Sequence, residues 1–260
     1  MAYKYYPGCT LRTKAKELDG YARKSMEALG VEASEPEEWQ CCGAVYPLGR
    51  DEVASKLAAM RVLAEAKREG KDVLTLCSAC HHVLKRVNHD IKVDAEIRNK
   101  ANNYLAMEEP YEGDTKVTHF MEMLRDDVGF EELKKKVTTP LTGRKIGAYY
   151  GCMLLRPSDV MAFDDAENPI LLESFIKAIG AEPVIFSYRN ECCGSYGSFE
   201  DKEAVKKHSC AVLESARGKG AEMLVTACPL CRYNLTQSGL GAAMPVQYFT
   251  ELLAEALGVK

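Results

Sequence analysis

Ten of the eleven cysteines in this chain fall into two sets of five that share one order along the sequence. Each set has a single cysteine, then a Cys-Cys-Gly triplet, then a Cys-x-x-Cys pair that follows the triplet after 33 residues. Thiols grouped at such short spacings are typical of metal or redox sites. The first set is Cys9, Cys41, Cys42, Cys77 and Cys80, and the second is Cys152, Cys192, Cys193, Cys228 and Cys231.

The number of thiols in each set favours an iron–sulfur cluster over zinc. A structural zinc ion takes four ligands and would leave one thiol unused in each half. Sites made only of thiolates select iron–sulfur clusters or zinc, and a cubane cluster also needs four ligands. Five thiols therefore indicate a larger cluster or a bridging thiolate, with zinc as the alternative. The glycines that would let the backbone approach inorganic sulfur are Gly8, Gly43, Gly151 and Gly194.

The composition is that of an ordinary globular protein of 260 residues. A net charge of -4 gives no reason to expect nucleic acid or an anionic membrane as a partner. The first residues lack the apolar core of a signal peptide, and no apolar run approaches membrane-spanning length. We therefore expect a cytoplasmic protein without direct membrane insertion. Reducing conditions disfavour structural disulfides, which leaves a disulfide framework as a weak alternative.

In the first half, short strands are expected to end just before cysteines. One strand ends before Cys9 and another delivers Cys77 at the start of a helix, where free N–H groups and the helix dipole favour thiolates. Gly30 and Gly70 are the expected helix stops. The predicted strands are 4–6, 31–33 and 73–76, and the predicted helices are 11–29, 51–70 and 78–91.

The second half repeats this plan, and each half closes with one further strand and helix. The closing segments, 117–124 and 246–253, have similar sequences. Residues between about 90 and 116 are additional in the first copy and predict a helix with a loop near Pro110. The strands predicted in the second half are 145–150, 183–187 and 223–226, and the helices are 168–179 and 201–219.

An internal duplication of a βα-alternating unit follows from these matches. Such alternation predicts mostly parallel sheets with helices on their faces. We expect an α/β fold of two tandem Rossmann-like repeats related by pseudo-twofold symmetry. The expected domains are residues 1–131 and 145–260, joined by a charged and then Thr/Pro/Gly-rich linker over 132–144.

The cysteine pattern resembles a known family. C-x31-CCG-x33-CxxC in the first half and C-x39-CCG-x33-CxxC in the second resemble the CCG domain. The tandem pair, from near residue 3 to residue 258, resembles the B subunit of heterodisulfide reductase, and Tyr6-Pro7-Gly8-Cys9 and Cys228-Pro229-Leu230-Cys231 also fit it. The resemblance implies one noncubane [4Fe-4S] iron–sulfur cluster per repeat, with all ten cysteines of the two sets as ligands.

The resemblance also implies a reaction and a set of partner subunits. In that family the two clusters act together to cleave a disulfide into two thiols, each handling one electron at a time. The partners are a flavin-containing A subunit and a ferredoxin-like iron–sulfur C subunit that passes electrons in. We therefore expect the catalytic subunit of a heterodisulfide reductase-type complex. Its substrate would be a small-molecule disulfide, CoM-S-S-CoB or another, held between clusters that face each other.

Two other functions stay open. One is an iron–sulfur electron-transfer subunit of another oxidoreductase complex without disulfide reductase activity, because CCG domains also occur in such subunits. The other is a thiol–disulfide oxidoreductase that uses the Cys228–Cys231 pair directly. That second function would not need the Cys-Cys-Gly triplets, so it is the weaker of the two.

Some polar residues near the cysteines have a structural interpretation beside a functional one. His81 and His82 are expected on a solvated helix face, and Cys210 is expected to be a small buried residue. Four arginines are expected to be packing or surface residues, although they would suit anionic substrate tails. These are Arg12, Arg156, Arg189 and Arg232.

Overall fold

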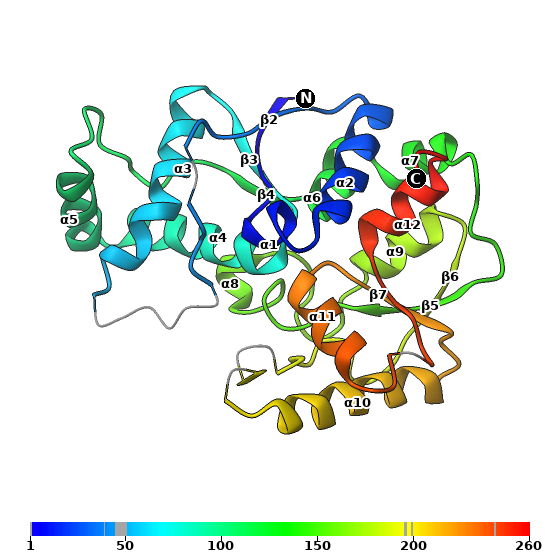
Figure 1. Cartoon of the computed structure of the whole chain (residues 1–260). Coiled ribbons are helices and arrows are strands. Elements are labelled where there is room, and N and C mark those ends of the chain that lie inside the picture. Colours follow the sequence, from blue (N-terminus) through cyan, green and yellow to red (C-terminus); the bar gives the residue numbers. More distant parts are fainter. Residues whose placement is uncertain (1, 39, 45–50, 195–196, 199, 242) are drawn as a thin grey trace.

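Two four-stranded parallel sheets with the same strand order form the framework of the protein (Figure 1). The computed structural model describes residues 2–38, 40–44, 51–194, 197–198, 200–241 and 243–260. The sheet orders are β2-β1-β3-β4 and β6-β5-β7-β8, and every pairing is parallel. The predicted α/β fold with two βα-alternating repeats is therefore confirmed.

Three of the four strands in the first half are short and mostly buried, as expected where helices cover both faces of a parallel sheet, and the edge strand over 32–34 is exposed. The four strands are β1 (Ala2–Tyr6), β2 (Glu32–Ser34), β3 (Asp72–Thr75) and β4 (Val117–His119). The helices are α1 (Cys9–Arg12), α2 (Lys16–Leu29), η1 (Ala54–Lys56), α3 (Leu57–Arg68), α4 (Ser78–Val93), α5 (Ala95–Leu105), α6 (Phe120–Met123), η2 (Leu124–Val128) and α7 (Phe130–Lys136).

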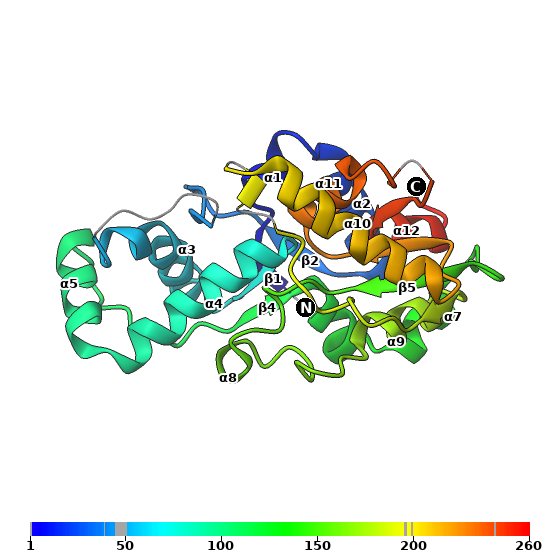
Figure 2. The ribbon, with the colours of Figure 1, turned by 90° about the horizontal axis from the view of Figure 1, so that it is seen from below.

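The second half repeats this order with fewer helices among the described residues. In Figures 1 and 2, α9 and α10 lie on opposite sides of β5. The strands are β5 (Lys145–Tyr149), β6 (Glu182–Val184), β7 (Met223–Thr226) and β8 (Val246–Tyr248). The helices are α8 (Ser158–Met161), α9 (Leu171–Ala178), α10 (Lys202–Gly218), α11 (Pro229–Gln237) and α12 (Phe249–Ala256).

Three predicted helices differ from the observed ones. The helix expected over 51–70 starts with a turn and the 3-10 helix η1, and becomes α-helical only at Leu57. The helix expected over 11–29 is broken into α1 and α2, because the N–H of Ala15 bonds back to the carbonyl of Thr10 at 2.9 Å. The helix expected from residue 168 begins only at Leu171. Asp164 accepts hydrogen bonds from the backbone of Ile170 and Leu171, which holds the preceding residues in a loop.

The additional residues of the first copy form a helix, as predicted. Asp94 caps α5 by accepting from the N–H groups of Glu96 and Ile97 at 2.9 and 3.0 Å. Helix α5 lies at one end of the molecule in both views (Figures 1 and 2). The segment predicted as a linker includes most of α7, and its Leu133 and Leu141 are buried.

The closing helix of each half packs against the other half. Helix α12 lies against α2, and Thr250 donates a hydrogen bond to the carbonyl of Leu18 at 3.0 Å. In return, α6 and α7 lie against α9. Because α2 and α9 are counterparts in the repeat, this exchange has the pattern of a twofold axis. One buried apolar cluster accordingly contains residues from both halves.

No helix within the described ranges combines the length and the apolar character that a membrane crossing requires.

Replacing Phe249 by alanine should lower the free energy of unfolding by about 3–5 kcal/mol, because it removes a fully buried ring. This ring contacts His119 and Phe120 of the first half and Phe175 of the second. Urea unfolding followed by circular dichroism gives the energy. Hydrogen exchange should show protection falling in both halves, and a loss confined to the second half would contradict the interlocked packing. Tyr104→Ala, at a 73% exposed position, is the control and should change stability by less than about 0.5 kcal/mol.

Candidate functional site: two joined thiol sets

The carboxyl ends of the central strands deliver the thiols. Cys9 begins α1 shortly after β1, and Cys77 is the N-cap of α4 just beyond β3. In the second half, Cys228 is the N-cap of α11 beyond β7, with Pro229 in the first turn of the helix. The carboxyl edge of a parallel sheet is where α/β proteins gather functional groups, so both sets form at that edge of their own sheet.

The ten thiols form one continuous chain of sulfur contacts. In the first half, the Cys41 and Cys9 sulfurs lie 3.4 Å apart, and those of Cys42 and Cys80 lie 3.5 Å apart. At each further step the two thiols are close enough for one to shift the pKa of the other. In order, the chain is Cys9, Cys41, Cys42, Cys80, Cys77, Cys228, Cys231, Cys193, Cys192 and Cys152.

The order of these thiols is symmetric, because matched positions of the two sets follow one another from either end, and the contact between Cys77 and Cys228 lies at the centre. The structure therefore brings together all ten cysteines that the sequence singled out. It also joins the two sets at their Cys-x-x-Cys pairs, which spacing alone did not predict.

Hydrogen bonds to backbone carbonyls next to Cys77 and Cys228 hold the two thiol sets together. Ser78 donates to the carbonyl of Ala227 through its hydroxyl at 2.7 Å and through its N–H at 3.2 Å. The buried Tyr248 hydroxyl lies 2.5 Å from the carbonyl of Leu76 and 3.0 Å from that of Ala227. Leu76 and Ala227 directly precede Cys77 and Cys228. Sequence reasoning missed Ser78 and Tyr248, although the alignment of the closing segments pairs Tyr248 with His119, which also bonds to the carbonyl of Leu76.

Two matched tyrosines hold the Cys-Cys-Gly triplets. The Tyr6 hydroxyl donates to the carbonyl of Gln40 at 2.5 Å, and that of Tyr149 donates to the carbonyl of Glu191 at 2.8 Å. Gln40 and Glu191 immediately precede the triplets. Burial, followed by the nearby cysteines, raises the pKa of both phenols, so both remain donors.

Exposure to solvent follows the same pattern in both sets. The last cysteine of each triplet and both cysteines of each Cys-x-x-Cys pair are buried. The first cysteine of each set and the first of each triplet are half-buried. Each set thus opens toward solvent on one side and meets the other set in the interior. The half-buried thiols are Cys9, Cys41, Cys152 and Cys192.

One thiol in each half is favoured as a thiolate. Hydrogen bonds from Cys41 and then Cys80 lower the pKa of Cys42 to about 3. The pKa of Cys228 is lowered well below its ordinary value, first by a hydrogen bond from Cys231 and then by one from Cys77. The donors have raised pKa values because they hold the shared protons. Thiolates are the form that binds metal, so each set has a first ligand available near neutral pH.

Two glycines form a cradle behind the sulfurs. Gly8 has φ +84°, and a Cβ there would lie 2.6 Å from the sulfur of Cys80. Gly151 has φ +65°, and its Cβ would lie 3.2 Å from the sulfur of Cys231. Both glycines are therefore needed for conformation and for space.

A thiolate-bound cluster fits this site by the chemistry of its donors and by the cradle that a Cβ would fill. Among the described residues, no three Cys, His, Asp or Glu side chains are arranged as the ligands of one single metal ion. The sulfur atoms meet in successive pairs instead.

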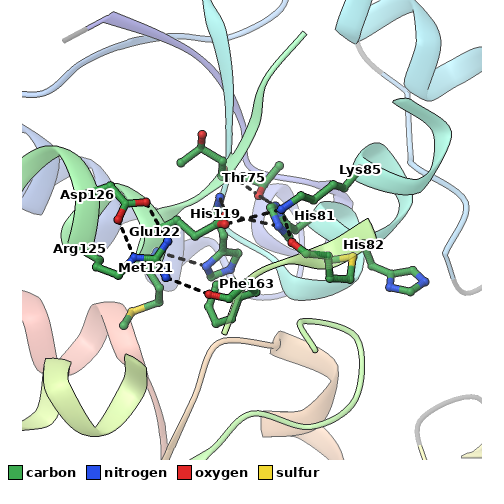
Figure 3. A network of polar contacts seen from close by, with 12 residues as sticks. Thr75, His81, His82, Lys85, His119, Met121, Glu122, Arg125, Asp126 and Phe163 are labelled. Atoms are coloured by element: carbon green, nitrogen blue, oxygen red, sulfur yellow. Dashed lines mark hydrogen bonds and ion pairs between the residues drawn. The ribbon is translucent and has the colours of Figure 1, made fainter. Parts of the chain in front are cut away.

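The prediction of a solvated face was wrong for His81, which is fully buried. Its Nδ1 lies 3.0 Å from the hydroxyl of Thr75, and its ring packs edge-on against His119 and Phe163 (Figure 3). The reason is that α4 is covered on this side by the closing segment of its own half and by the second half. Burial lowers the pKa of His81 well below its ordinary value. His82 is half-buried, with Nδ1 3.1 Å from the carbonyl of Met153.

The four arginines each pair with a carboxylate of the chain itself. Arg189 is buried and pairs with Glu173, which makes it a packing residue. The other pairs are Arg12–Glu35 at 3.2 Å, Arg156–Glu167 at 2.7 Å and Arg232–Glu251 at 3.2 Å. Cys210 is half-buried rather than buried, and its thiol donates to the carbonyl of Ser238 at 3.1 Å.

Gly8→Ala should remove the iron–sulfur cluster predicted for the first set, because the added methyl group displaces the Cys80 sulfur and the left-handed backbone resists a side chain. The chain should then lose about half of its iron and acid-labile sulfide after anaerobic purification. Gly20→Ala is the matched control, since no atom lies within 4 Å of its Cβ position in α2 and alanine favours a helix. Full iron and sulfide in Gly8→Ala would contradict the requirement for glycine at this position.

The family model of the cysteine-rich CCG domain matches this chain twice, over residues 3–85 and 146–236. Each match contains one complete thiol set.

Curated relatives match over nearly the whole chain. The 8-methylmenaquinol:fumarate reductase membrane anchor subunit of Wolinella succinogenes is 33% identical, over 99% of this chain and 92% of that protein. The B subunit of the ferredoxin/F420H2-dependent CoB-CoM heterodisulfide reductase of Methanosarcina acetivorans is 29% identical, over 97% of this chain and 88% of that protein. A protein of Archaeoglobus profundus, named for its likeness to the B subunit of heterodisulfide reductase, is 27% identical over 98% of this chain and 90% of its own length.

A solved structure supports the fold. A hypothetical protein from Helicobacter pylori aligns with a TM-score of 0.74 at 13% identity, over 100% of this chain and 49% of that chain. This chain thus spans about half the length of that protein. With two domain matches that together cover more than half of its length, the chain belongs to the cysteine-rich CCG domain family and carries the domain in two tandem copies.

Proposed function

We propose that this chain is an iron–sulfur oxidoreductase subunit that reductively cleaves a small-molecule disulfide. The observation that carries the proposal is the single chain of ten thiols joined at Cys77 and Cys228. With this arrangement of thiols, two redox centres would lie next to each other. Reducing a disulfide takes two electrons and two protons and yields two thiols, so a joined pair of one-electron centres suits this reaction.

The proposed ligands are the five cysteines of each set, holding one noncubane [4Fe-4S] cluster per repeat. Each cluster would supply one electron and an iron that accepts a substrate sulfur as a thiolate. The chain itself positions these groups: the strand ends and glycines fix the buried cysteines, and the half-buried ones lie on the side open to solvent. A disulfide would therefore approach from that side.

The heterodisulfide reductase relatives support the assignment of the reaction and of the complex. We infer that the partners are a ferredoxin-like iron–sulfur C subunit and a flavin-containing A subunit, in the cytoplasm. We also retain residues 1–131 and 145–260 as the two domains, with 132–144 as the connection between them.

The Wolinella relative favours a second candidate function, because it is named as the membrane anchor subunit of a fumarate reductase. In that case this chain would pass electrons within a reductase complex without cleaving a disulfide. The two candidates share the clusters and differ in whether a substrate sulfur binds to them.

Cys42→Ala and Cys193→Ala should each remove the cluster of one set and leave the other. The expected result is a loss of about half of the iron and acid-labile sulfide per chain in either variant, because each residue supplies a buried ligand. Cys210→Ala, outside both sets, is the matched control and should keep all of its iron. Unchanged iron in either ligand variant, or zinc without sulfide in the parent protein, would contradict the assignment.

Reduced protein should cleave a disulfide, and its EPR spectrum should change when the corresponding thiols are added. Candidates are CoM-S-S-CoB and other small disulfides, with thiol release measured anaerobically. Both Cys42→Ala and Cys193→Ala should abolish turnover, since each electron requires its own cluster. A spectrum that no thiol alters, with clusters intact, would favour the electron-transfer function.

A further inference from the structure

Among the described residues, a buried side-chain amide bonds to a sulfur of the second thiol set and has no counterpart in the first. Asn234 on α11 is buried, and its side-chain Nδ2 donates to the sulfur of Cys193 at 3.5 Å. Asn234 lies three residues after Cys231, the last cysteine of the second set. The residue three positions after Cys80 is Val83, whose side chain has neither an N–H nor an O–H group. The first set thus has an apolar side chain at the matching position.

The surroundings of the two sets are similar in other respects, apart from an exposed contact of 4.0 Å between the Thr10 hydroxyl and the Cys9 sulfur in the first set. Cys42 is 5% exposed and its counterpart Cys193 is 2% exposed, so the exposure of this ligand to solvent differs little. The N–H of Gly43 approaches the sulfur of Cys41 at 3.5 Å, and that of Gly194 approaches Cys192 at 3.3 Å.

Each Cys-x-x-Cys helix also carries a cation paired with a carboxylate of its closing segment, although the two cations lie at different positions along their helices. Arg232, beside Cys231, pairs with Glu251 at 3.2 Å. Lys85, on the helix that follows Cys77, pairs with Glu122 at 3.6 Å. Each Cys-x-x-Cys helix therefore presents one cation next to one carboxylate of the closing segment. The amide of Asn234 remains as a difference that acts directly on a ligand sulfur.

A hydrogen bond to a ligand sulfur stabilises the reduced form of an iron–sulfur centre more than the oxidised form, because reduction adds negative charge that the sulfur shares. Such a bond raises the reduction potential. Its removal should lower that potential, with no change in the set of ligands.

We propose that Asn234 raises the reduction potential of the centre in the second set above that of the centre in the first set. The inference rests on the proposed iron–sulfur function. A one-electron donor protein would first reduce the second centre, and a second electron would then reduce the first, with no bond broken until a disulfide binds. Asn234 is a positioning residue in this account, since it acts through Cys193.

Potentiometric titration of the whole chain, followed by EPR, tests the inference. The parent protein should show two potentials, and Cys42→Ala, which keeps the second centre, should retain the higher one. Asn234→Leu has nearly the shape of asparagine without its donor. It should lower the higher potential, so that at a fixed potential the ratio of reduced to oxidised centre falls about tenfold. For a one-electron couple this is about 59 mV.

Three further variants are measured in the same titration, to repeat, reverse or control the effect of Asn234→Leu. Asn234→Val copies the first half and should have the same effect if Asn234→Leu folds poorly. The reciprocal Val83→Asn should raise the lower potential. Gln237→Leu, at an exposed position of α11, should alter neither.

If Asn234→Leu and Asn234→Val leave both potentials unchanged, or lower the lower one, the inference is wrong while the clusters stand. If the parent protein holds no iron or sulfide, the proposed function itself fails.

Discussion

The contact between Cys77 and Cys228 is the interaction on which the rest of this structure depends. Both thiols are buried, and each cysteine stands at the N-cap position of the helix that follows a central strand of its sheet. Bringing them together requires the carboxyl edges of the two sheets to meet. The exchange of closing helices, α12 onto α2 and α6 with α7 onto α9, provides the apolar area that holds the halves in this arrangement. A single CCG repeat would have one thiol set and an uncovered helix face.

The same join explains why polar groups are buried so deeply between the halves. Backbone carbonyls at the ends of β3 and β7 lie in the interior, where an unpaired carbonyl is costly. Tyr248 and Ser78 satisfy those of Leu76 and Ala227, and His119 adds a second donor to Leu76. These donors fix the positions of the residues that precede the central cysteines. The tyrosines at the ends of β1 and β5 do the same for the triplets.

Much of this arrangement was predictable because its determinants are local. The strand expected over 223–226 is β7 with the same bounds, and Gly30 ends α2 in the left-handed conformation, as expected. What sequence reasoning missed depends on distant residues. The apolar stripe on α2 indicates that one face of this helix is buried, but it does not indicate that α12 is the element that covers it. His81 was expected in solvent because the second half that buries it follows far along the chain, and Tyr248 lies 172 residues from the carbonyl of Leu76.

Two centres in contact have a magnetic consequence that two separate centres lack. The most direct measurement is the EPR spectrum of the fully reduced chain, recorded anaerobically with iron and sulfide quantified in the same sample. Two clusters held next to each other should give a spectrum with spin–spin interaction between two paramagnetic centres in one chain. Two independent signals without interaction, or a chain that holds no iron–sulfur centre, would contradict this prediction.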